Sequence, residues 1–160
     1  MRDGISAGGH SVQIIGNRIT NTHNEDPAYS GGVSISVFPH DLEVITTGQV
    51  ISNNVIVGAV DGFSETGIAV YGSSAPLITG NQVLDLKPAQ STILSAIVMA
   101  EWGGIPTTGA VLARNSFMAR GPGVRAVNGV AALCTNNVAI GVEVGAFANC
   151  QAAAGNTVIP

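Results

Sequence analysis

The chain has 160 residues and a net charge of −4, from six basic and ten acidic side chains, and only 10% of its residues are charged. Soluble domains usually carry about a quarter charged residues, so this composition is unusually uncharged. A protein that binds nucleic acid needs a basic surface, and this balance argues against such a partner. The hydrophobic content of 46% likewise excludes intrinsic disorder. The length suits one domain, residues 1–160, with a core of Val, Ile, Leu and Ala.

Neither a membrane-spanning segment nor a signal peptide is visible. Gly, Asn, Ser or a charged residue interrupts every apolar run before the roughly 18 residues that a membrane-spanning helix needs. Residues 1–6 contain an Arg but lack the apolar segment that follows it in a signal peptide. The two cysteines, Cys134 and Cys150, are so sparse that they favour two small buried core residues over a disulfide framework or a metal site.

Two short sequence patterns alternate along the chain. One is apolar-x-x-Asn-x-apolar, and the other is a Gly followed by alternating apolar residues. Alternation predicts strands, and no segment between the patterns has a helical period. In chain order, the predicted strand segments are 4–7, 14–19, 32–35, 51–56, 67–70, 78–83, 95–98, 112–117, 123–126, 133–139, 141–144 and 153–158.

The Asn of the first pattern has a physical reason to recur. A sharp corner between strands needs a residue with positive φ, and Asn adopts that conformation more readily than most residues that have a side chain. Where such corners stack at the strand spacing of about 4.8 Å, each amide can donate to the next. An asparagine ladder is therefore predicted at Asn17, Asn54, Asn81, Asn115, Asn137 and Asn156.

The alternation of Gly-led strands and Asn corners resembles the right-handed parallel β-helix of the pectin-lyase-like superfamily, from Gly4 to Ile159. The resemblance implies an all-β fold, a right-handed parallel β-helix (solenoid) of about six coils. No cap is visible at either end of the stack, so we expect a segment of a longer β-helix, or ends covered by further coils or trimer partners. One inward stack is predicted to contain Ile5, Val33, Ile68, Ile97 or its neighbour, Val124 and Val142, and another Ile19, Ile56, Val83, Phe117 and Val158.

In relatives of this fold the ligand groove runs along the first sheet, which the Gly-led strands would form. The alternation predicts that Ser34, Ser36 and Arg125 face outward there, and stacking should bring the turns after these strands to one edge. An aromatic ring beside a carboxylate suits sugar binding, because the ring packs on C–H groups while the carboxylate accepts hydroxyl hydrogen bonds. The predicted ligand-binding residues are Phe38, Tyr71, Trp102, Ser34 and Ser36.

The catalytic candidates are His40, Asp41, Glu101 and Arg125. The segment Pro39-His40-Asp41 resembles the Asp-Pro-His segment of β-helix alginate epimerases, although Phe38 stands where that motif has its leading Asp. Asp41 and Glu101, about two strand spacings or 10 Å apart, would suit an inverting hydrolase. A lyase needs a base such as Lys or Arg, and only Arg125 is predicted on the groove face, beside Glu143 of the next coil.

Acidic residues recur in the loops before the first-sheet strands. Clustered oxygens suit Ca²⁺, but none of these loops has the spacing of a calcium-binding loop. The sequence therefore requires no cofactor and leaves Ca²⁺ as a possibility, with the candidate ligands Glu25, Asp26, Asp61, Glu65 and Asp85.

These observations lead to three hypotheses about function. The first is a carbohydrate-binding module of an extracellular or cell-surface protein, which engages a polysaccharide and has neither a nucleic-acid nor a membrane partner. The second is a polysaccharide lyase, epimerase or hydrolase domain, and the third is a structural spacer of an adhesin or phage tail spike. Whether the domain is an enzyme stays open at this point.

Overall fold

The fold is known from a computed structural model, which describes residues 4–20, 22, 32–41, 44–58, 66–84, 86, 95–118, 123–128, 132–142, 145–147 and 149–160, without the side chains of residues 152 and 153. In these ranges the chain forms nineteen strands and no helix. The described part therefore contains no long apolar helix of the kind that crosses a membrane.

Nearly all strands belong to three long sheets, in which every neighbouring pair is parallel. The first sheet contains β1 (Ile5–Gly8), β4 (Val33–Phe38), β8 (Thr66–Tyr71), β12 (Ser95–Ala100) and β15 (Val124–Ala126). The second contains β2 (Gln13–Ile15), β6 (Val50–Ser52), β10 (Leu77–Thr79), β13 (Val111–Ala113), β16 (Ala132–Thr135) and β18 (Cys150–Ala154). The third contains β3 (Arg18–Thr20), β7 (Val55–Val57), β11 (Gln82–Leu84), β14 (Ser116–Met118), β17 (Val138–Ile140) and β19 (Thr157–Ile159). A short fourth sheet pairs β5 (Thr46–Thr47) with β9 (Ser73–Ser74).

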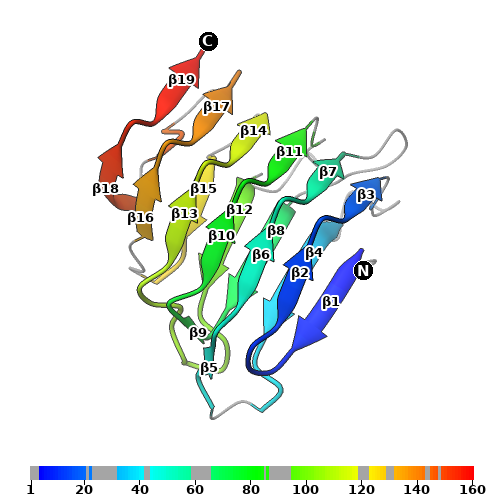
Figure 1. Ribbon diagram of the computed structural model, residues 1–160. Helices are drawn as coiled ribbons and strands as arrows, with labels where there is room; N and C mark the ends of the chain where they lie inside the picture. Colours follow the sequence, from blue (N-terminus) through cyan, green and yellow to red (C-terminus); the bar gives the residue numbers. More distant parts are fainter. Residues whose placement is uncertain are drawn as a thin grey trace, which may run out of the picture.

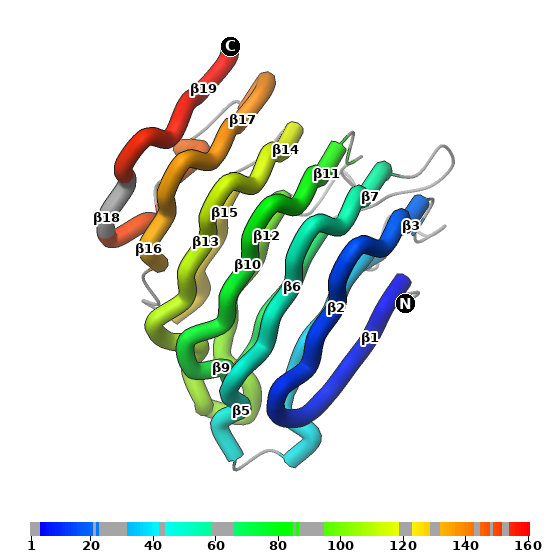
Figure 2. The backbone as a smooth tube through the Cα atoms, in the orientation of Figure 1, coloured from blue at the N-terminus to red at the C-terminus, as the bar shows by residue number. Residues whose placement is uncertain are grey.

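Each of the first five coils takes one strand from each long sheet in turn, and the described part of the sixth coil contributes strands to the second and third sheets. In Figure 1 the chain runs up the nearer second and third sheets, returns down the more distant first sheet, and advances toward the C-terminus as a right-handed coil. Figure 2 shows the bend between the second-sheet and third-sheet strands in each coil, and it places the two termini at opposite ends of the stack. The protein is an all-β parallel solenoid, as predicted.

The core is formed by inward side chains that stack from coil to coil. In the first sheet Ile5, Ile35, Ile68, Ile97 and Val124 are in register. The prediction of Val33 in this stack is wrong, because Val33 pairs with Thr66 instead. Val33, Ile35 and Val37 alternate alike, and a slip of two residues keeps the alternation unchanged, so the pattern alone does not fix the register.

The sixth coil also differs from the prediction. Residues 141 and 142 follow β17 without forming a strand, and residues 143 and 144 lie outside the described residues. The neighbour of β15 in the next coil is Ala146, whose carbonyl accepts a hydrogen bond of 3.1 Å from the Val124 amide. Val142 packs, half-buried, against the core.

The corner between the second and third sheets uses positive φ one residue earlier than predicted. The residues in this conformation are Gly16, Asn53, Gly80, Arg114, Asn136 and Gly155, each directly before a ladder Asn. The ladder asparagines are not among the residues with positive φ. The corner thus divides two tasks, because one residue makes the turn and the next points its amide into the stack.

The corner between the first and second sheets contains a second polar stack, which the sequence analysis missed. Thr46 and Ser73 are buried with their Oγ atoms 3.0 Å apart, and the Ser73 amide donates to Thr107 Oγ1 at 3.3 Å. Thr107 Oγ1 in turn donates to the Ala100 carbonyl at 2.8 Å. A sequence signal does exist, since Thr-Thr-Gly, Ser-Ser-Ala and Thr-Thr-Gly each begin five residues before Ile51, Ile78 or Leu112.

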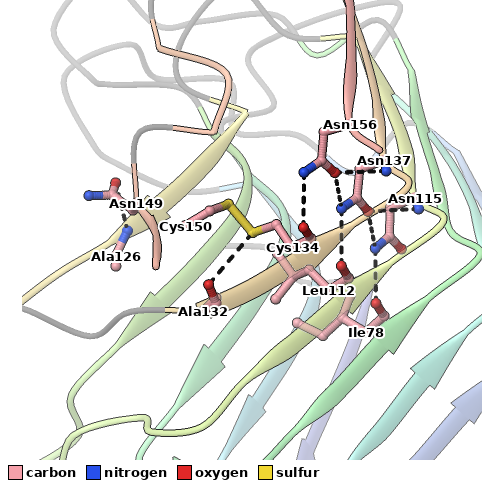
Figure 3. Close-up of a disulfide and its surroundings, with 10 residues drawn as sticks. All are labelled: Ile78, Leu112, Asn115, Ala126, Ala132, Cys134, Asn137, Asn149, Cys150 and Asn156. Carbon is pink, nitrogen blue, oxygen red and sulfur yellow. Dashed lines mark hydrogen bonds between the residues drawn. A yellow bond between two sulfur atoms is a disulfide. The ribbon is translucent and has the colours of Figure 1, made fainter. Parts of the chain in front are cut away.

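Cys134 and Cys150 form a disulfide, so the interpretation as two unpaired core residues is wrong. They lie on the neighbouring strands β16 and β18, and their Cα atoms are 5.7 Å apart. Figure 3 shows the disulfide between them. The register between these strands shifts after the pair Ala132–Cys150. The small number of cysteines did not predict this pairing. Two residues sixteen positions apart become neighbours in space because one coil is about that long.

Candidate functional site

Three aromatic side chains from successive coils meet at the C-terminal end of the first sheet. Phe38 ends β4, Tyr71 ends β8, and Trp102 follows β12. The Trp102 ring stacks on Phe38 with a centroid distance of 5.5 Å and lies tilted against Tyr71 at 5.8 Å. All three are half-buried. We call these three residues the aromatic edge, and their convergence is what stacking of the coils predicts.

Small neighbours make room for these rings. Gly8 is the register partner of Phe38 in β1, and a Cβ added at Gly8 would lie 3.3 Å from the Phe38 ring. Ala100 is the register partner of Tyr71 on the other side. The large side chains are therefore flanked by small ones, so that Trp102 can fold back over the row.

A tight hairpin holds Trp102 in place. Trp102 and Ile105 exchange two backbone hydrogen bonds, of 2.9 and 3.0 Å. Between them Gly103 and Gly104 have φ of 56° and 84°, and positive φ at both central residues is the mark of a type I′ turn. The tryptophan is therefore fixed by a rigid two-residue turn rather than by a long loop.

The polar candidates of this edge face the solvent. His40 and Asp41 follow β4, and Glu101 lies between β12 and Trp102, and all three are exposed. The chain thus places them at the same end of the first sheet as the aromatic edge. They supply two carboxylates and one imidazole that a ligand can reach.

The outer face of the first sheet differs from the predicted groove. Ser34 is only 1% exposed, and it lies one residue before Ile35, just as Gly67 lies one residue before Ile68. A Cβ added at Gly67 would meet Val83 of the third sheet, so this position points into the coil and the prediction of an outward Ser34 is wrong. Ser36 lies on the outer face next to Ala69, but it is only 6% exposed.

That outer face carries a second apolar cluster. Buried Ala69, Val98 and Ala100 form it, and Val33, Tyr71 and Val127 pack against it. Arg125 is the register partner of Val98 and is half-buried, whereas its predicted neighbour Glu143 lies outside the described residues. Both serines are therefore buried, whereas the exposed candidates His40, Asp41 and Glu101 follow the strands of this sheet at its C-terminal end.

The calcium candidates Glu25, Asp26, Asp61, Glu65 and Asp85 all lie outside the described residues. Among the residues that are described, no three His, Cys, Asp or Glu side chains come together in the manner of a metal site. The possibility of Ca²⁺ in the long loops therefore stays a prediction.

The six asparagines form a continuous ladder inside the corner. Asn54 shows the typical rung, since its amide N and Nδ2 both donate to Asn81 Oδ1, at 3.0 and 2.9 Å, and Nδ2 also donates to the Ile14 carbonyl at 2.9 Å. Figure 3 shows the last three rungs, Asn115, Asn137 and Asn156. The ladder positions no ligand group and serves to hold the coils in register.

The fold and this edge define a parallel β-solenoid with a solvent-facing aromatic and acidic end. Comparison of the chain with protein families, with curated proteins and with solved structures found no match.

Proposed function

We propose that the chain is a polysaccharide-binding module of an extracellular or cell-surface protein, built on a β-helix of the pectin-lyase-like kind. The observation that carries the proposal is the convergence of Phe38, Tyr71 and Trp102 beside the exposed carboxylates of Asp41 and Glu101. Only 4% of the chain is aromatic, so three such residues at one edge are a marked concentration.

The chemistry of this edge matches that of a sugar. A half-buried ring offers its remaining surface to the C–H groups of a pyranose, while nearby carboxylates accept hydrogen bonds from its hydroxyl groups. The two carboxylates repel polyanionic chains, so a neutral glycan rich in hydroxyl groups is the favoured ligand class. The type I′ turn fixes Trp102 before the ligand arrives, which reduces the entropy lost on binding.

The proposal is tested by a glycan-array screen of the purified chain, with and without Ca²⁺. Trp102→Ala is expected to weaken binding about tenfold or more, because it removes the ring that contacts both other aromatics. Met118→Ala is the matched control, since Met118 is 40% exposed on the third sheet, away from this edge. Absence of binding by the folded chain in both conditions would rule out the carbohydrate function.

A catalytic function at the same edge is the second candidate, and the exposed pair Asp41 and Glu101 is the observation that favours it. It requires that the bound glycan be cleaved or epimerised. Product analysis on the glycan found in the screen, with His40→Ala and Glu101→Gln beside the unaltered chain, separates catalysis from binding alone. Unchanged product formation in both variants would remove these residues from any catalytic role.

A spacer function in an adhesin or tail spike is the third candidate. It is favoured by the uninterrupted asparagine ladder and by outer rows without charge, such as Val57, Leu84, Met118, Ile140 and Ile159 on the third sheet. A spacer predicts that the chain folds stably but binds no glycan, which is the negative outcome of the same screen.

A further inference from the structure

The turns around the aromatic edge contain acidic residues and neither Lys nor Arg. Residues 39–45 follow β4, residue 72 follows β8, and residues 101–110 lie between β12 and β13. The acidic residues of these segments are Asp41, Glu43 and Glu101, of which Glu43 lies outside the described residues. His40 is the only other titratable side chain in them. Negative charge therefore exceeds positive charge at this edge even when the imidazole is protonated.

The two described carboxylates are not neutralised by neighbours. Asp41 and Glu101 are exposed, and neither forms an ion pair within the part of the chain that the structure describes. Arg18 lies on β3 in the third sheet, and Arg114 lies at the corner between the second and third sheets. Both arginines are thus on other parts of the coil, and the two carboxylates are free to interact with a ligand.

Arg125 is the only described basic residue on the first sheet, and it lies well away from the aromatic edge. Its register partner Val98 precedes Trp102 by four residues, which corresponds to about 13 Å along a strand. At physiological ionic strength, charges are screened over about 8 Å. The guanidinium group therefore does little to reduce the negative potential at Trp102.

Packing across the third coil brings the two acidic turns together. Phe38 and Trp102 stack at a centroid distance of 5.5 Å although β8 lies between β4 and β12. Gly72 permits this contact, because a Cβ added there would lie 2.7 Å from Pro39 Cγ and 3.2 Å from Trp102 Cβ. Asp41 is two residues after Pro39, and Glu101 is directly before Trp102. Carboxylates from the second and fourth coils therefore flank the same aromatic edge.

A cation is attracted by both components of this edge. An ammonium group within about 6 Å of an aromatic ring interacts favourably with the π electrons, and Trp is the strongest partner. Trp102 is half-buried, so part of the indole stays accessible. The Cα atoms of Glu101 and Trp102 are one peptide unit, or about 3.8 Å, apart. One ammonium group can thus reach an indole and a carboxylate together.

We propose that the aromatic edge prefers glycans of amino sugars whose amines are free and protonated, an inference that rests on the glycan-binding function proposed above. A neutral sugar gains from packing on the rings and from hydroxyl hydrogen bonds. A protonated amino sugar keeps both and adds cation–π attraction and a charge-assisted hydrogen bond to a carboxylate. A polyuronate is repelled by the same carboxylates. The preferred ligand class is therefore a polycationic glycan.

The test compares two ligands of equal length by isothermal titration calorimetry. One is the β-1,4-linked tetramer of glucosamine, and the other is the same tetramer with every amine acetylated. The buffer is mildly acidic, so that the sugar amines are protonated while exposed carboxylates stay ionised. The unaltered chain is expected to bind the free-amine tetramer about tenfold more tightly. The ratio should approach one in about 1 M salt, where the screening length falls to about 3 Å.

Two variants locate the preference. Asp41→Asn combined with Glu101→Gln removes both charges and keeps side-chain size and an acceptor oxygen, so the affinity ratio should fall to about one. Arg18→Gln is the control, because it changes the net charge by one unit on the third sheet and should leave the ratio as it is in the unaltered chain. A change of the ratio in Arg18→Gln as large as in the double variant would overturn the proposal, because overall charge would then decide binding.

The remaining outcomes separate this preference from glycan binding itself. Equal affinity of the unaltered chain for the two tetramers overturns the preference and leaves the glycan-binding function in place. Absence of binding to any glycan of the array, by a chain shown to be folded by circular dichroism, overturns both. A blocked tetralysine peptide carries the same number of ammonium groups without a sugar ring. If it binds as tightly as the free-amine tetramer, the edge recognises a basic peptide and the amino-sugar proposal is wrong.

Discussion

Single asparagine side chains connect each coil to the next, and the cost of losing one depends on its place in the ladder. Asn81 is fully buried and makes four side-chain hydrogen bonds, to Asn54, Asn115 and the Ile51 carbonyl. Asn17 is half-buried and has a rung on one side only. The two residues share their chemistry and differ in position, which makes them a matched pair.

We expect Asn81→Ala to lower the free energy of unfolding by about 3 kcal/mol or more, because it leaves several buried polar groups without partners. Asn17→Ala should lower it by about 1 kcal/mol. Urea denaturation followed by circular dichroism measures both values. Equal effects of the two substitutions would contradict a ladder whose strength comes from burial.

Arg114 is the only corner residue with positive φ before a ladder Asn that is neither Gly nor Asn, within the described residues. Its φ is 55°, and this conformation costs a residue with a Cβ about 1 kcal/mol or more relative to Gly. Arg114→Gly should therefore raise the free energy of unfolding by about 0.5 to 1 kcal/mol, after the greater chain entropy of Gly is subtracted. The midpoint of urea unfolding reports the gain. Arg114→Ala keeps the strained conformation and should give no gain, so an equal gain there would assign the effect to the charge instead.

The ladder positions are predictable from sequence, because a buried amide row requires Asn at one place in every coil. The residue that makes the turn is not, since Asn53 and Asn54 are equally able to adopt positive φ. Arg114 before Asn115 is the informative case. An exposed Arg can make the turn but cannot take the buried ladder place, so the ladder Asn must be the second residue of each corner.

At the scale of elements, the first sheet can pack closely against the third sheet only where the inward residue is small. Gly67 lies at such a position, where an added Cβ would come within 2.5 Å of Val83 Cγ1 and 2.8 Å of the Ala96 carbonyl oxygen. Its φ is not in the left-handed region, so any cost of substitution comes from space alone. One of the two contacts is backbone, which leaves little room for adjustment.

Gly67→Ala should therefore lower the free energy of unfolding by about 1 to 3 kcal/mol, in the range of overpacked cores. Gly8→Ala is the control in the same sheet, because its Cβ would reach the Phe38 ring at 3.3 Å and no backbone atom closer than 3.4 Å. Thermal unfolding of both variants measures the difference. A larger loss in the control would show that the aromatic edge, and not closure of the coil, is the tighter constraint.

The elements themselves are readable from sequence because each strand repeats one alternation of apolar residues. The exposure of side chains on the first sheet is harder to predict from the sequence. Ser34 is predicted outward from a strict alternation along the strand, but the alternation is interrupted at this point, because the position of Ser34, occupied by Gly67 in the next coil and by Ala96 in the one after, faces the core together with the isoleucine that follows it. The burial of Ser36 depends on which residues cover the outer face of the sheet, and the alternation of residues within one strand does not predict these.

At the scale of the molecule, stability in a solenoid is the sum of coils and of the contacts between neighbours, so the ends are weaker than the middle. The disulfide between Cys134 and Cys150 lies in the last two coils. It closes a short loop at the end where Val158 and Ile159 are exposed. The cross-link therefore strengthens the part of the stack that has neighbours on one side only.

The double substitution Cys134→Ala and Cys150→Ala should destabilise the last coils by about 3 kcal/mol, the value expected for a closed loop of this length. Hydrogen exchange should then rise in β18 and β19 while β8 and β12 stay protected. Chemical reduction of the unaltered chain should have the same effect. A uniform increase of exchange in all coils would show that the solenoid unfolds as one cooperative unit.

The whole fold was predictable because its repeats are local and similar. The candidate site was predictable only where stacking alone brings residues together, as it does for Phe38, Tyr71 and Trp102. Whether the outer face is open depends on packing between segments distant in sequence, and the pairing of two cysteines depends on the length of one particular coil. The repeated sequence pattern therefore predicts neither the exposure of the outer face nor the disulfide.

The asparagine ladder also gives the solenoid an electric polarity. Between consecutive rungs, Nδ2 of one Asn donates to Oδ1 of the Asn in the following coil, and an amide carries a dipole of about 3.5 D. The side-chain dipoles therefore add along the axis, with the positive end at the C-terminal coil. Two molecules that meet end to end attract when their axes point the same way and repel when they oppose. Since amides do not titrate, this orientational preference persists when the pH changes.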